Sequence, residues 1–329
     1  LFVRVAGGRE IDYQYTLPAD RVEGLRKISG VAAVDLFRAQ DISYNDKPAV
    51  LGSGDFNALS RYGNLVIKSG PNAQELSSWM VDQDRAIISE SFALKHKVGV
   101  GDSLLLKTPG GPLELNIAAV YYDYSRERGY IIVDRSTFVK YYGDPDINSF
   151  VLYLSDKGEL ENVRQKILQT LGADYKLVIR SNPELKKNVL EIFDKTFAIT
   201  YSLEIIAGAV ALLGLFNTLI SLILERKREI GILRFIGGFR EQVKRMIIVE
   251  AGILGVIGSV MGLVAGGIVS LILIFVINKQ SFGWTIQVHY PYGFILFSLV
   301  VFWVVSLISG MYPARLAVNL NPKEAVRVE

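Results

Sequence analysis

Residues 225–245 read ERKREIGILRFIGGFREQVKR and separate two long apolar segments of the chain. This stretch holds seven Lys or Arg residues and three Glu residues, whereas residues 205–224 before it and 251–277 after it hold no charge. An uncharged run of about 20 residues is long enough to cross the hydrocarbon core of a bilayer as a helix. Since short loops rich in Lys and Arg stay in the cytoplasm, this stretch predicts both a membrane protein and its orientation.

Three segments are long and apolar enough to be membrane spans, at about residues 197–224, 246–277 and 290–313. The loop between the second and third spans has one cation, Lys279, whereas the tail after the third has three. We therefore expect residues 225–245 and the C-terminus to be cytoplasmic, and residues 278–289 to be external. The domain before the first span, residues 1–196, must then also be external.

The composition of the 329 residues excludes several classes of function. A net charge of +3 is too small to indicate a nucleic-acid partner, and without cysteine no thiolate metal site or thiol nucleophile can form. The two histidines, His96 and His289, lie in different regions, so a His-based triad or metal site is not expected. The chain also has no Gly-rich loop ending in Lys-Ser/Thr. We therefore expect no catalytic residue, metal or directly bound cofactor.

The external domain is expected to be an α/β sandwich interrupted by an insertion. A strand at Leu1–Val5 is followed by a strand over Ile11–Leu17, a helix from Pro18 to about Ser29 and a strand over Val31–Phe37. A second strand–helix–strand unit takes up residues 149–180, with a helix over 156–171. The two units, residues 1–37 and 149–182, therefore predict a split α/β sandwich, which the family resemblance given below implies to be porter-like, and residues 38–148 predict an inserted β-rich subdomain.

The insertion contains strand patterns at residues 86–89, 103–107, 114–120 and 130–133, and a short helix at 91–97. A run of aromatic and charged residues, 121–128, precedes the last strand. It is interpreted either as the edge of a β-hairpin or as a contact surface for a substrate or a periplasmic partner. The residues of that contact surface would be Tyr121, Tyr122, Tyr124, Arg126 and Arg128.

One continuous helix is predicted from Pro183 to Leu224, because Ser181 or Asn182 can cap it and no breaker follows. This helix would join the external domain rigidly to the first span. Residues 183–329 would thus form a stalk helix and a transmembrane domain.

Three glycines of the second span lie four residues apart, at Gly258, Gly262 and Gly266, so they share one helix face. Such a face lets a second helix approach closely. Two interpretations stay open, namely packing within this chain and an interface of a dimer or of two halves of a larger protein.

Three motifs of the chain resemble the FtsX/MacB-like permease superfamily, the membrane subunits of one class of ABC transporters. The first is residues 225–240, a charged run followed by Glu-Ile-Gly-Ile-Leu-Arg and a glycine turn. The second is residues 312–317 together with 321–327, and the third is residues 86–93 together with 98–102. The resemblance covers nearly the whole chain, and it implies a further membrane helix upstream of Leu1. It also implies that the chain is the C-terminal half of a larger permease, with a tandem repeat as one arrangement.

The resemblance implies that residues 226–236 form a coupling helix, which docks on a separate cytoplasmic ATPase dimer. The docking residues are Arg226, Lys227, Arg228, Glu229, Ile232, Leu233, Arg234, Phe235, Gly237 and Gly238. ATP and Mg would act only through that partner. The alternative is an amphipathic helix on anionic lipid, but Glu229 and the Gly-Gly turn add nothing to lipid binding.

Two functions fit these expectations for a bacterial inner-membrane protein. In the first, the chain is a permease that extrudes or extracts a lipoprotein, lipid, peptide or drug, with a possible outer-membrane or periplasmic partner. In the second, it transports nothing and transmits ATPase motion to a periplasmic partner such as a cell-wall hydrolase. The size of the external domain favours the first.

Overall fold

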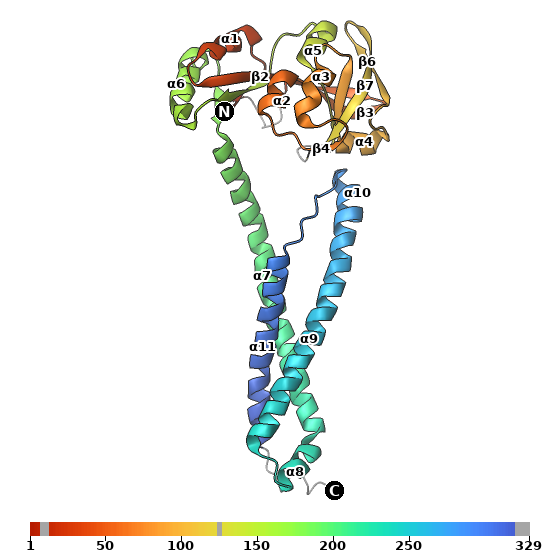
Figure 1. The fold of residues 1–329 in the computed structure, drawn as a ribbon, viewed down its shortest axis with the longest axis vertical. Helices are drawn as coiled ribbons and strands as arrows, with labels where there is room; N and C mark the ends of the chain where they lie inside the picture. Colours follow the sequence, from red (N-terminus) through yellow and green to blue (C-terminus); the bar gives the residue numbers. More distant parts are fainter. Residues whose placement is uncertain (7–12, 124–126, 320–329) are drawn as a thin grey trace. The chain divides into compact units, whose positions relative to one another are not determined.

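The computed structural model describes residues 1–6, 13–123 and 127–319 (Figure 1). The chain divides into two compact units. The first comprises Leu1–Val189 and Ile274–Ile286, and the second comprises Leu190–Leu273 and Gln287–Glu329.

The first unit is built on a 10-stranded mixed sheet, with the order β10-β1-β9-β2-β3-β8-β5-β7-β4 and with β6 paired to β7. Two pairs, β3 with β8 and β5 with β7, are parallel, and the other pairs are antiparallel. The strands are β1 (Phe2–Val5), β2 (Val31–Tyr44), β3 (Lys47–Gly54), β4 (Ile67–Ser69), β5 (Arg85–Ser89), β6 (Ser103–Thr108), β7 (Gly111–Tyr121), β8 (Tyr130–Asp134), β9 (Ser149–Leu154) and β10 (Leu177–Arg180).

Short helices cover this sheet and connect its strands (Figure 1). The α-helices are α1 (Ala19–Glu23), α2 (Phe56–Tyr62), α3 (Leu76–Met80), α4 (Glu90–His96), α5 (Arg135–Tyr142) and α6 (Leu160–Leu171). The 3-10 helices are η1 (Gly24–Lys27), η2 (Ala73–Glu75) and η3 (Lys157–Glu159).

The long strand β2 changes partner along its length. Residues up to Phe37 pair with β9, whereas residues from Arg38 onward pair with β3. One apolar cluster lies beside the first part and includes Val34, Phe150 and Ile167. Two further clusters lie beside the rest of the sheet, around Phe92 and Phe56 respectively. The predicted division into a sandwich and an insertion stays a prediction, since β2 crosses its boundary without a break.

Several predicted elements of this unit are confirmed, among them β1, β9, α4 and the β6–β7 hairpin. The strand predicted over Ile11–Leu17 is wrong within its described part, residues 13–17, where only Leu17 makes an isolated bridge. The reason is a side chain, because Asn148 Nδ2 donates to the carbonyls of Tyr13 (2.8 Å) and Tyr15 (3.3 Å). A side-chain amide thus takes the place of a strand ladder.

Two predicted helices are shorter than expected. The helix from Pro18 is one α-turn, α1, followed by the 3-10 turn η1. The helix expected from Asp156 begins with η3, and α6 starts at Leu160 and ends at Leu171, before Gly172. The α-helical part of α6 buries one stripe, Val163, Ile167 and Leu171, at the spacing of an amphipathic helix.

The remaining helices are α7 (Asn182–Glu225), α8 (Lys227–Phe235), α9 (Arg240–Ile272), the π-helix η4 (Leu273–Asn278), α10 (Lys279–Phe282) and α11 (Tyr292–Asn319). The continuous helix predicted over 183–224 is confirmed by α7. Within the described residues, three helical segments are long and apolar enough to cross a membrane by length and composition, namely Asn182–Glu225, Arg240–Ser281 and Tyr292–Val318. The predicted fold class is therefore confirmed. The third helix continues past Pro313, where the prediction ended it.

The first turn of α7 is closed by a capping box. The Glu184 carboxylate accepts the Ser181 N–H at 2.6 Å, and the Ser181 hydroxyl accepts the Glu184 N–H at 3.3 Å. The same carboxylate binds Arg164 of α6 through two hydrogen bonds of 2.9 and 2.8 Å. These bonds lower the pKa of Glu184 to about 2. The start of α7 is therefore attached to the α/β sheet by a charge-assisted contact as well as by the chain.

Within the second unit, α9 packs along α11, and glycines allow the approach. A Cβ added at Gly255 would lie 2.5 Å from Ser306 Oγ, and one added at Gly310 would lie 2.6 Å from the Ala251 side chain. The end of α7 joins them through a cluster of Ile223, Ile230, Val243, Ile247, Ala314 and Ala317.

Candidate functional site

The predicted docking helix is present as α8, between two of the candidate spans (Figure 1). Two glycines end it. Gly237 has a φ of +105°, and the Gly238 N–H donates to the Leu233 carbonyl at 2.9 Å. A Cβ on Gly238 would lie 2.6 Å from that same carbonyl oxygen. Both positions therefore require glycine, which explains why the sequence turns sharply from α8 into α9.

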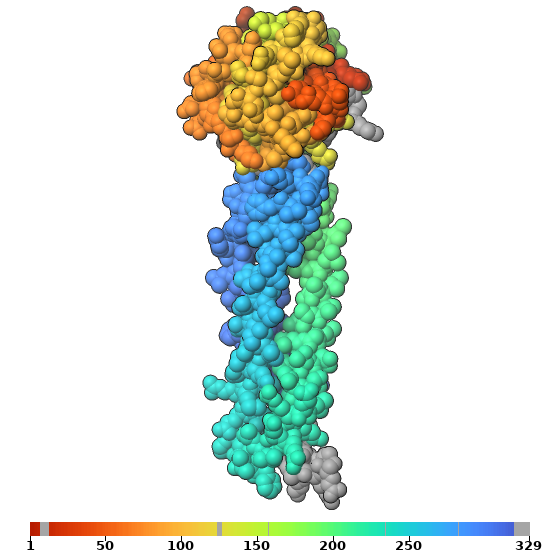
Figure 2. Space-filling view, turned by 90° about the vertical axis from the view of Figure 1, so that its right-hand side faces the viewer, coloured from red at the N-terminus to blue at the C-terminus, as the bar shows by residue number. Residues whose placement is uncertain are grey.

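One side of α8 is anchored and the other is open. Ile230 is buried against the ends of α7, α9 and α11. Five apolar side chains near α8 are exposed to between 43% and 80%, a high value for such residues. They are Ile232, Leu233, Phe235, Ile236 and Phe239. The space-filling view shows this segment, in teal, at the surface of one end of the helical unit (Figure 2).

Charged residues lie next to this apolar surface. Arg226 pairs with Glu250 of α9 at 3.1 Å, which fixes the junction of α7 and α8 to the next helix. Arg228 and Glu229 are exposed, and Lys227 is half-buried. The side chain of Arg234 lies outside the described side chains. An exposed apolar patch with charges around it is typical of a protein-binding surface.

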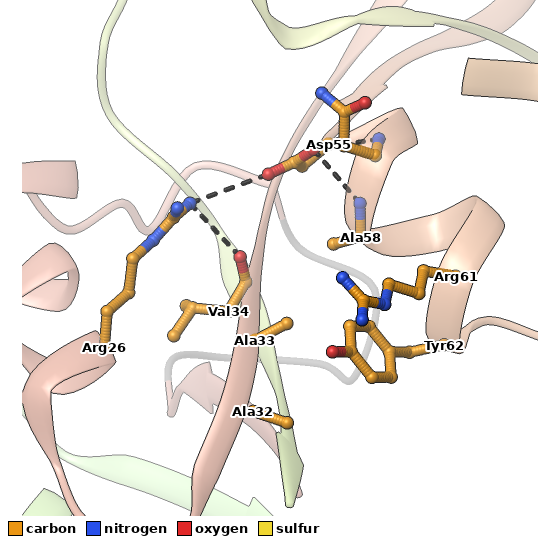
Figure 3. Close-up of a pocket in the computed structure, with 9 residues that line it drawn as sticks. Arg26, Ala32, Ala33, Val34, Asp55, Ala58, Arg61 and Tyr62 are labelled. Atoms are coloured by element: carbon orange, nitrogen blue, oxygen red, sulfur yellow. Dashed lines mark hydrogen bonds and ion pairs between the residues drawn. The ribbon is translucent and has the colours of Figure 1, made fainter. Parts of the chain in front are cut away.

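A cavity of about 260 Å³ lies in the first unit between η1, β2 and α2 (Figure 3). Arg26 enters it from η1, while Arg61 and Tyr62 enter it from α2. Asp55 caps α2 by accepting the N–H groups of Asn57 and Ala58 at 3.0 and 3.2 Å. The Asp55 carboxylate also lies 3.6 Å from Arg26, and both residues line a second cavity of about 320 Å³. The Asp55 carboxylate therefore stabilises the N-terminus of α2, with the Arg26 guanidinium beside it.

A buried carboxyl group lies beside this cavity. Asp35 on β2 is 8% exposed and accepts the Asp55 N–H at 3.0 Å. Burial raises the pKa of Asp35 to about 6, against the smaller lowering by that hydrogen bond. Burial, with the charges of Asp35 and Asp55, also raises the pKa of Tyr153 to about 12. His96, the histidine of this unit, instead contacts the Phe92 ring, with ring centroids 4.3 Å apart. The protonation of Asp35 thus couples pH to the contact between β2 and the start of α2.

Residues 201–322 match the family model for the FtsX-like permease C-terminal domain. An uncharacterised ABC transporter permease of Mycobacterium tuberculosis is 32% identical over 226 residues, which are 69% of this chain and 26% of that protein. The macrolide export ATP-binding/permease protein MacB of Campylobacter jejuni is 26% identical over 311 residues, 94% of this chain and 42% of that protein.

This chain is an FtsX/MacB-like ABC transporter permease. It spans less than two thirds of the length of either relative. The solved periplasmic region of MacB from Actinobacillus actinomycetemcomitans is similar in structure, at 14% identity and a TM-score of 0.43. The match covers 57% of this chain and 91% of that structure. That likeness is too weak to indicate a function.

The structure distributes the residues predicted as a periplasmic contact surface over different environments. Tyr121 is buried in the permease core, and burial raises the pKa of its hydroxyl well above the usual value. Its side chain is therefore not part of an accessible surface. Tyr122 is half-buried below Lys68, 5.9 Å from its ring, and Arg128 is exposed beside Asp41 at 3.5 Å. Tyr124 and Arg126 lie outside the described residues.

The three glycines predicted for helix packing are separate from those that contact α11. An added Cβ at Gly258, Gly262 or Gly266 would meet no atom within 4 Å in the described part of the permease. The contacts with α11 involve Gly252 and Gly255 instead. The predicted packing role of the stripe is thus still open.

One polar site was not foreseen as a functional site from the sequence. Glu90, the first residue of α4, is fully buried, and its carboxylate pairs with Lys68 of β4. It also accepts the backbone N–H of Thr285 at 2.9 Å. These partners lie 22 and 195 residues away along the chain. The only sequence signal was the position of Glu90 inside the motif at residues 86–93.

Proposed function

We propose that this permease is the membrane subunit of an ABC transporter whose ATP is hydrolysed by a separate cytoplasmic ATPase. The observation that carries the proposal is α8, a short helix between two candidate spans. Phe235 at its end, and Ile236 and Phe239 in the turn that follows it, are 80%, 78% and 73% exposed. An apolar surface of this kind needs a partner. ATP and Mg would be held by that partner, and this chain would have no catalytic role.

Movement of the docked helix would reach the external domain through α7. This helix is continuous over 44 residues, so it contains no flexible linker. Its first turn is attached to α6 by Glu184 and Arg164. The proposed outcome is extrusion or extraction of a lipoprotein, lipid, peptide or drug. The relatives named for macrolide export favour transport over the transmission of force to a periplasmic hydrolase.

The proposed location is a bacterial inner membrane, with residues 1–196 outside and the C-terminus in the cytoplasm. The charge of residues 225–245 supports this orientation. A second permease or permease half would pack on the open face of Gly258, Gly262 and Gly266. A periplasmic partner would meet Tyr122, Tyr124, Arg126 and Arg128, without Tyr121.

The docking assignment is tested by a charge reversal, Glu229→Lys with Arg234→Glu. The double variant should no longer co-purify the ATPase, while its yield in the membrane stays unchanged. A matched control reverses two exposed charges of the β6–β7 hairpin, one on each strand, by Lys107→Glu with Glu114→Lys. If the α8 variant retains the ATPase as well as the control does, α8 is not the docking element.

The orientation is tested with single cysteines, because the native chain has none. A cysteine introduced by Lys279→Cys should react with a membrane-impermeant thiol reagent in intact cells, and one introduced by Arg240→Cys should react only after lysis. The reverse pattern would invert the proposed topology.

A further inference from the structure

A third cavity lies inside the first unit, where its segment Ile274–Ile286 contacts the α/β sheet. It has a volume of about 510 Å³ and lies between α4, the turn before β8 and the region of α10. We call it the α4–α10 cavity. All of its lining residues belong to this one unit.

Buried polar contacts fix the walls of the α4–α10 cavity. Glu90 of α4 is fully buried and accepts the Thr285 N–H at 2.9 Å. Lys68 pairs with the other oxygen of the same carboxylate. Within the segment of Thr285 itself, Asn278 Nδ2 donates to the Trp284 carbonyl at 2.7 Å. The segment that contains α10 is thus held against the start of α4, and the cavity depends on that attachment.

The lining of the cavity carries an excess of positive charge. It includes Lys95, Arg128 and Lys279, against one carboxylate, Glu127. Among the described residues, no carboxylate forms an ion pair with Lys95 or Lys279, and Arg128 has only the exposed Asp41 at 3.5 Å. A concave site lined mainly by one sign of charge attracts ligands of the opposite sign.

The neutral part of the lining holds three hydrogen-bonding side chains besides Pro48, Leu94 and Gly283. Ser91, Gln280 and Ser281 add hydroxyl and amide donors to the two ammonium groups and the guanidinium. A guanidinium matches two phosphate oxygens, and lysines bind phosphate as point charges. The volume is within the usual range for a small-molecule site.

The position of Lys279 and Ser281 in the sequence indicates where such a ligand would come from. Both are among the last residues of the second candidate span, Arg240–Ser281. They therefore lie where that helix leaves the hydrocarbon and meets the headgroup region.

We propose that the α4–α10 cavity binds a phosphate anion, presented by an anionic lipid headgroup at the outer membrane surface. This inference rests on the proposed function for the external placement of residues 278–289. A lipid headgroup and free phosphate would both present a phosphate group, and the experiment below distinguishes these two ligands.

The test measures binding to the purified permease in neutral detergent, without an ATPase. The probes are monomeric dihexanoyl phosphatidylglycerol, dihexanoyl phosphatidylcholine and inorganic phosphate. The cavity variant is Lys95→Gln with Arg128→Gln and Lys279→Gln. The matched control loses the same charge at three exposed lysines outside the cavity, through Lys27→Gln with Lys107→Gln and Lys176→Gln. Circular dichroism checks that both variants fold.

Phosphatidylglycerol should bind the cavity variant at least about tenfold more weakly than it binds the wild type. This corresponds to a loss of roughly 1.4 kcal/mol in the free energy of binding. The control should bind it like the wild type, and phosphatidylcholine should bind weakly to all three proteins. Inorganic phosphate binding as tightly as phosphatidylglycerol, with the same loss, would identify free phosphate as the ligand.

Three results overturn the proposal, namely no binding to the wild type, equal loss in both variants, and equal affinity for the two lipids. A cavity variant that does not fold is replaced by Lys279→Gln alone, which should still weaken phosphatidylglycerol binding. None of these measurements depends on α8, so a failed docking test would leave them unaffected.

Discussion

Replacing Asp35 by Asn should make the α/β unit more stable at neutral pH, although it removes a buried charge that accepts a hydrogen bond. The folded domain raises the pKa of Asp35 from 3.8 to about 6, mainly through burial. Between these two values the folded state binds a proton that the unfolded state does not bind. The contribution of Asp35 to the free energy of unfolding is therefore fully present below about pH 4, and it is lost as the pH rises through 6.

The size of the effect follows from the pKa difference. A shift of roughly two units at about 1.4 kcal/mol each gives about 3 kcal/mol as the upper limit of the destabilisation at pH 7.5. The amide side chain introduced by Asp35→Asn keeps an oxygen for the Asp55 N–H and carries no charge. The free energy of unfolding of the variant should thus exceed that of the wild type by up to about 3 kcal/mol at pH 7.5 and match it near pH 4.

Hydrogen exchange of the β2 and β9 amides measures this difference in the purified permease, with intrinsic rates corrected for pH. The control is Asp134→Asn, another buried aspartate, which caps α5 and whose replacement leaves Asp35 in place. This control should keep the pH dependence of the wild type. Equal pH profiles for the wild type and Asp35→Asn would refute the burial argument.

Three further predictions concern the helices. Gly238→Ala should prevent co-purification of the ATPase, because a Cβ there would lie 2.6 Å from the Leu233 carbonyl oxygen that accepts the Gly238 N–H. The control is Gly214→Ala, because a Cβ added at Gly214 meets no atom within 4 Å. Gly255→Val should lower the melting temperature of the isolated permease, whereas Gly258→Val should leave it unchanged and reduce crosslinking between two permease copies. Glu184→Gln should speed hydrogen exchange in the first turn of α7 at pH 7. This difference should persist well below pH 4.5, because the pKa of Glu184 is about 2. Unchanged exchange would show that Arg164 does not hold the helix start.

The helical half of the molecule could be predicted from the sequence because its signals are local. Charge-free runs define the spans, the Asn182-Pro183 start defines α7, and Gly237-Gly238 defines the end of α8. Each of these signals lies within a few residues of the feature it determines. In the same way, the end of α6 at Leu171 followed from Gly172.

The polar sites around Asp35 and Glu90 could not be predicted in this way, because their partners are distant in the sequence. Asp35 has a raised pKa only because β2 is covered by other elements, and nothing near it in the sequence indicates this burial. The strand expected over residues 13–17 failed for the same kind of reason, since Asn148 is more than 130 residues away along the chain. Periodicity indicates which face of an element is apolar, but it does not indicate which side chain will replace a backbone partner.

The motif at residues 86–93 shows how one short segment can serve both kinds of contact. Ser89 caps α4 locally by accepting the Phe92 N–H at 3.3 Å, and it also accepts the Tyr130 N–H of β8 at 2.9 Å. Gly129, just before β8, has a φ of +83°, and a Cβ there would lie 2.7 Å from the Phe92 backbone. The close approach of β8 to α4 thus requires glycine at 129.

Glu90 then lies at the start of a helix whose position is fixed by these contacts, so its carboxylate can hold a distant backbone group. Its contact with Thr285 links α4 to the segment that follows the second candidate span. Loss of this carboxylate should release that segment without unfolding the sheet. Glu90→Gln should therefore speed hydrogen exchange at residues 283–286 and leave β5 protected. Equal protection in the variant and the wild type would show that the segment is held by other contacts.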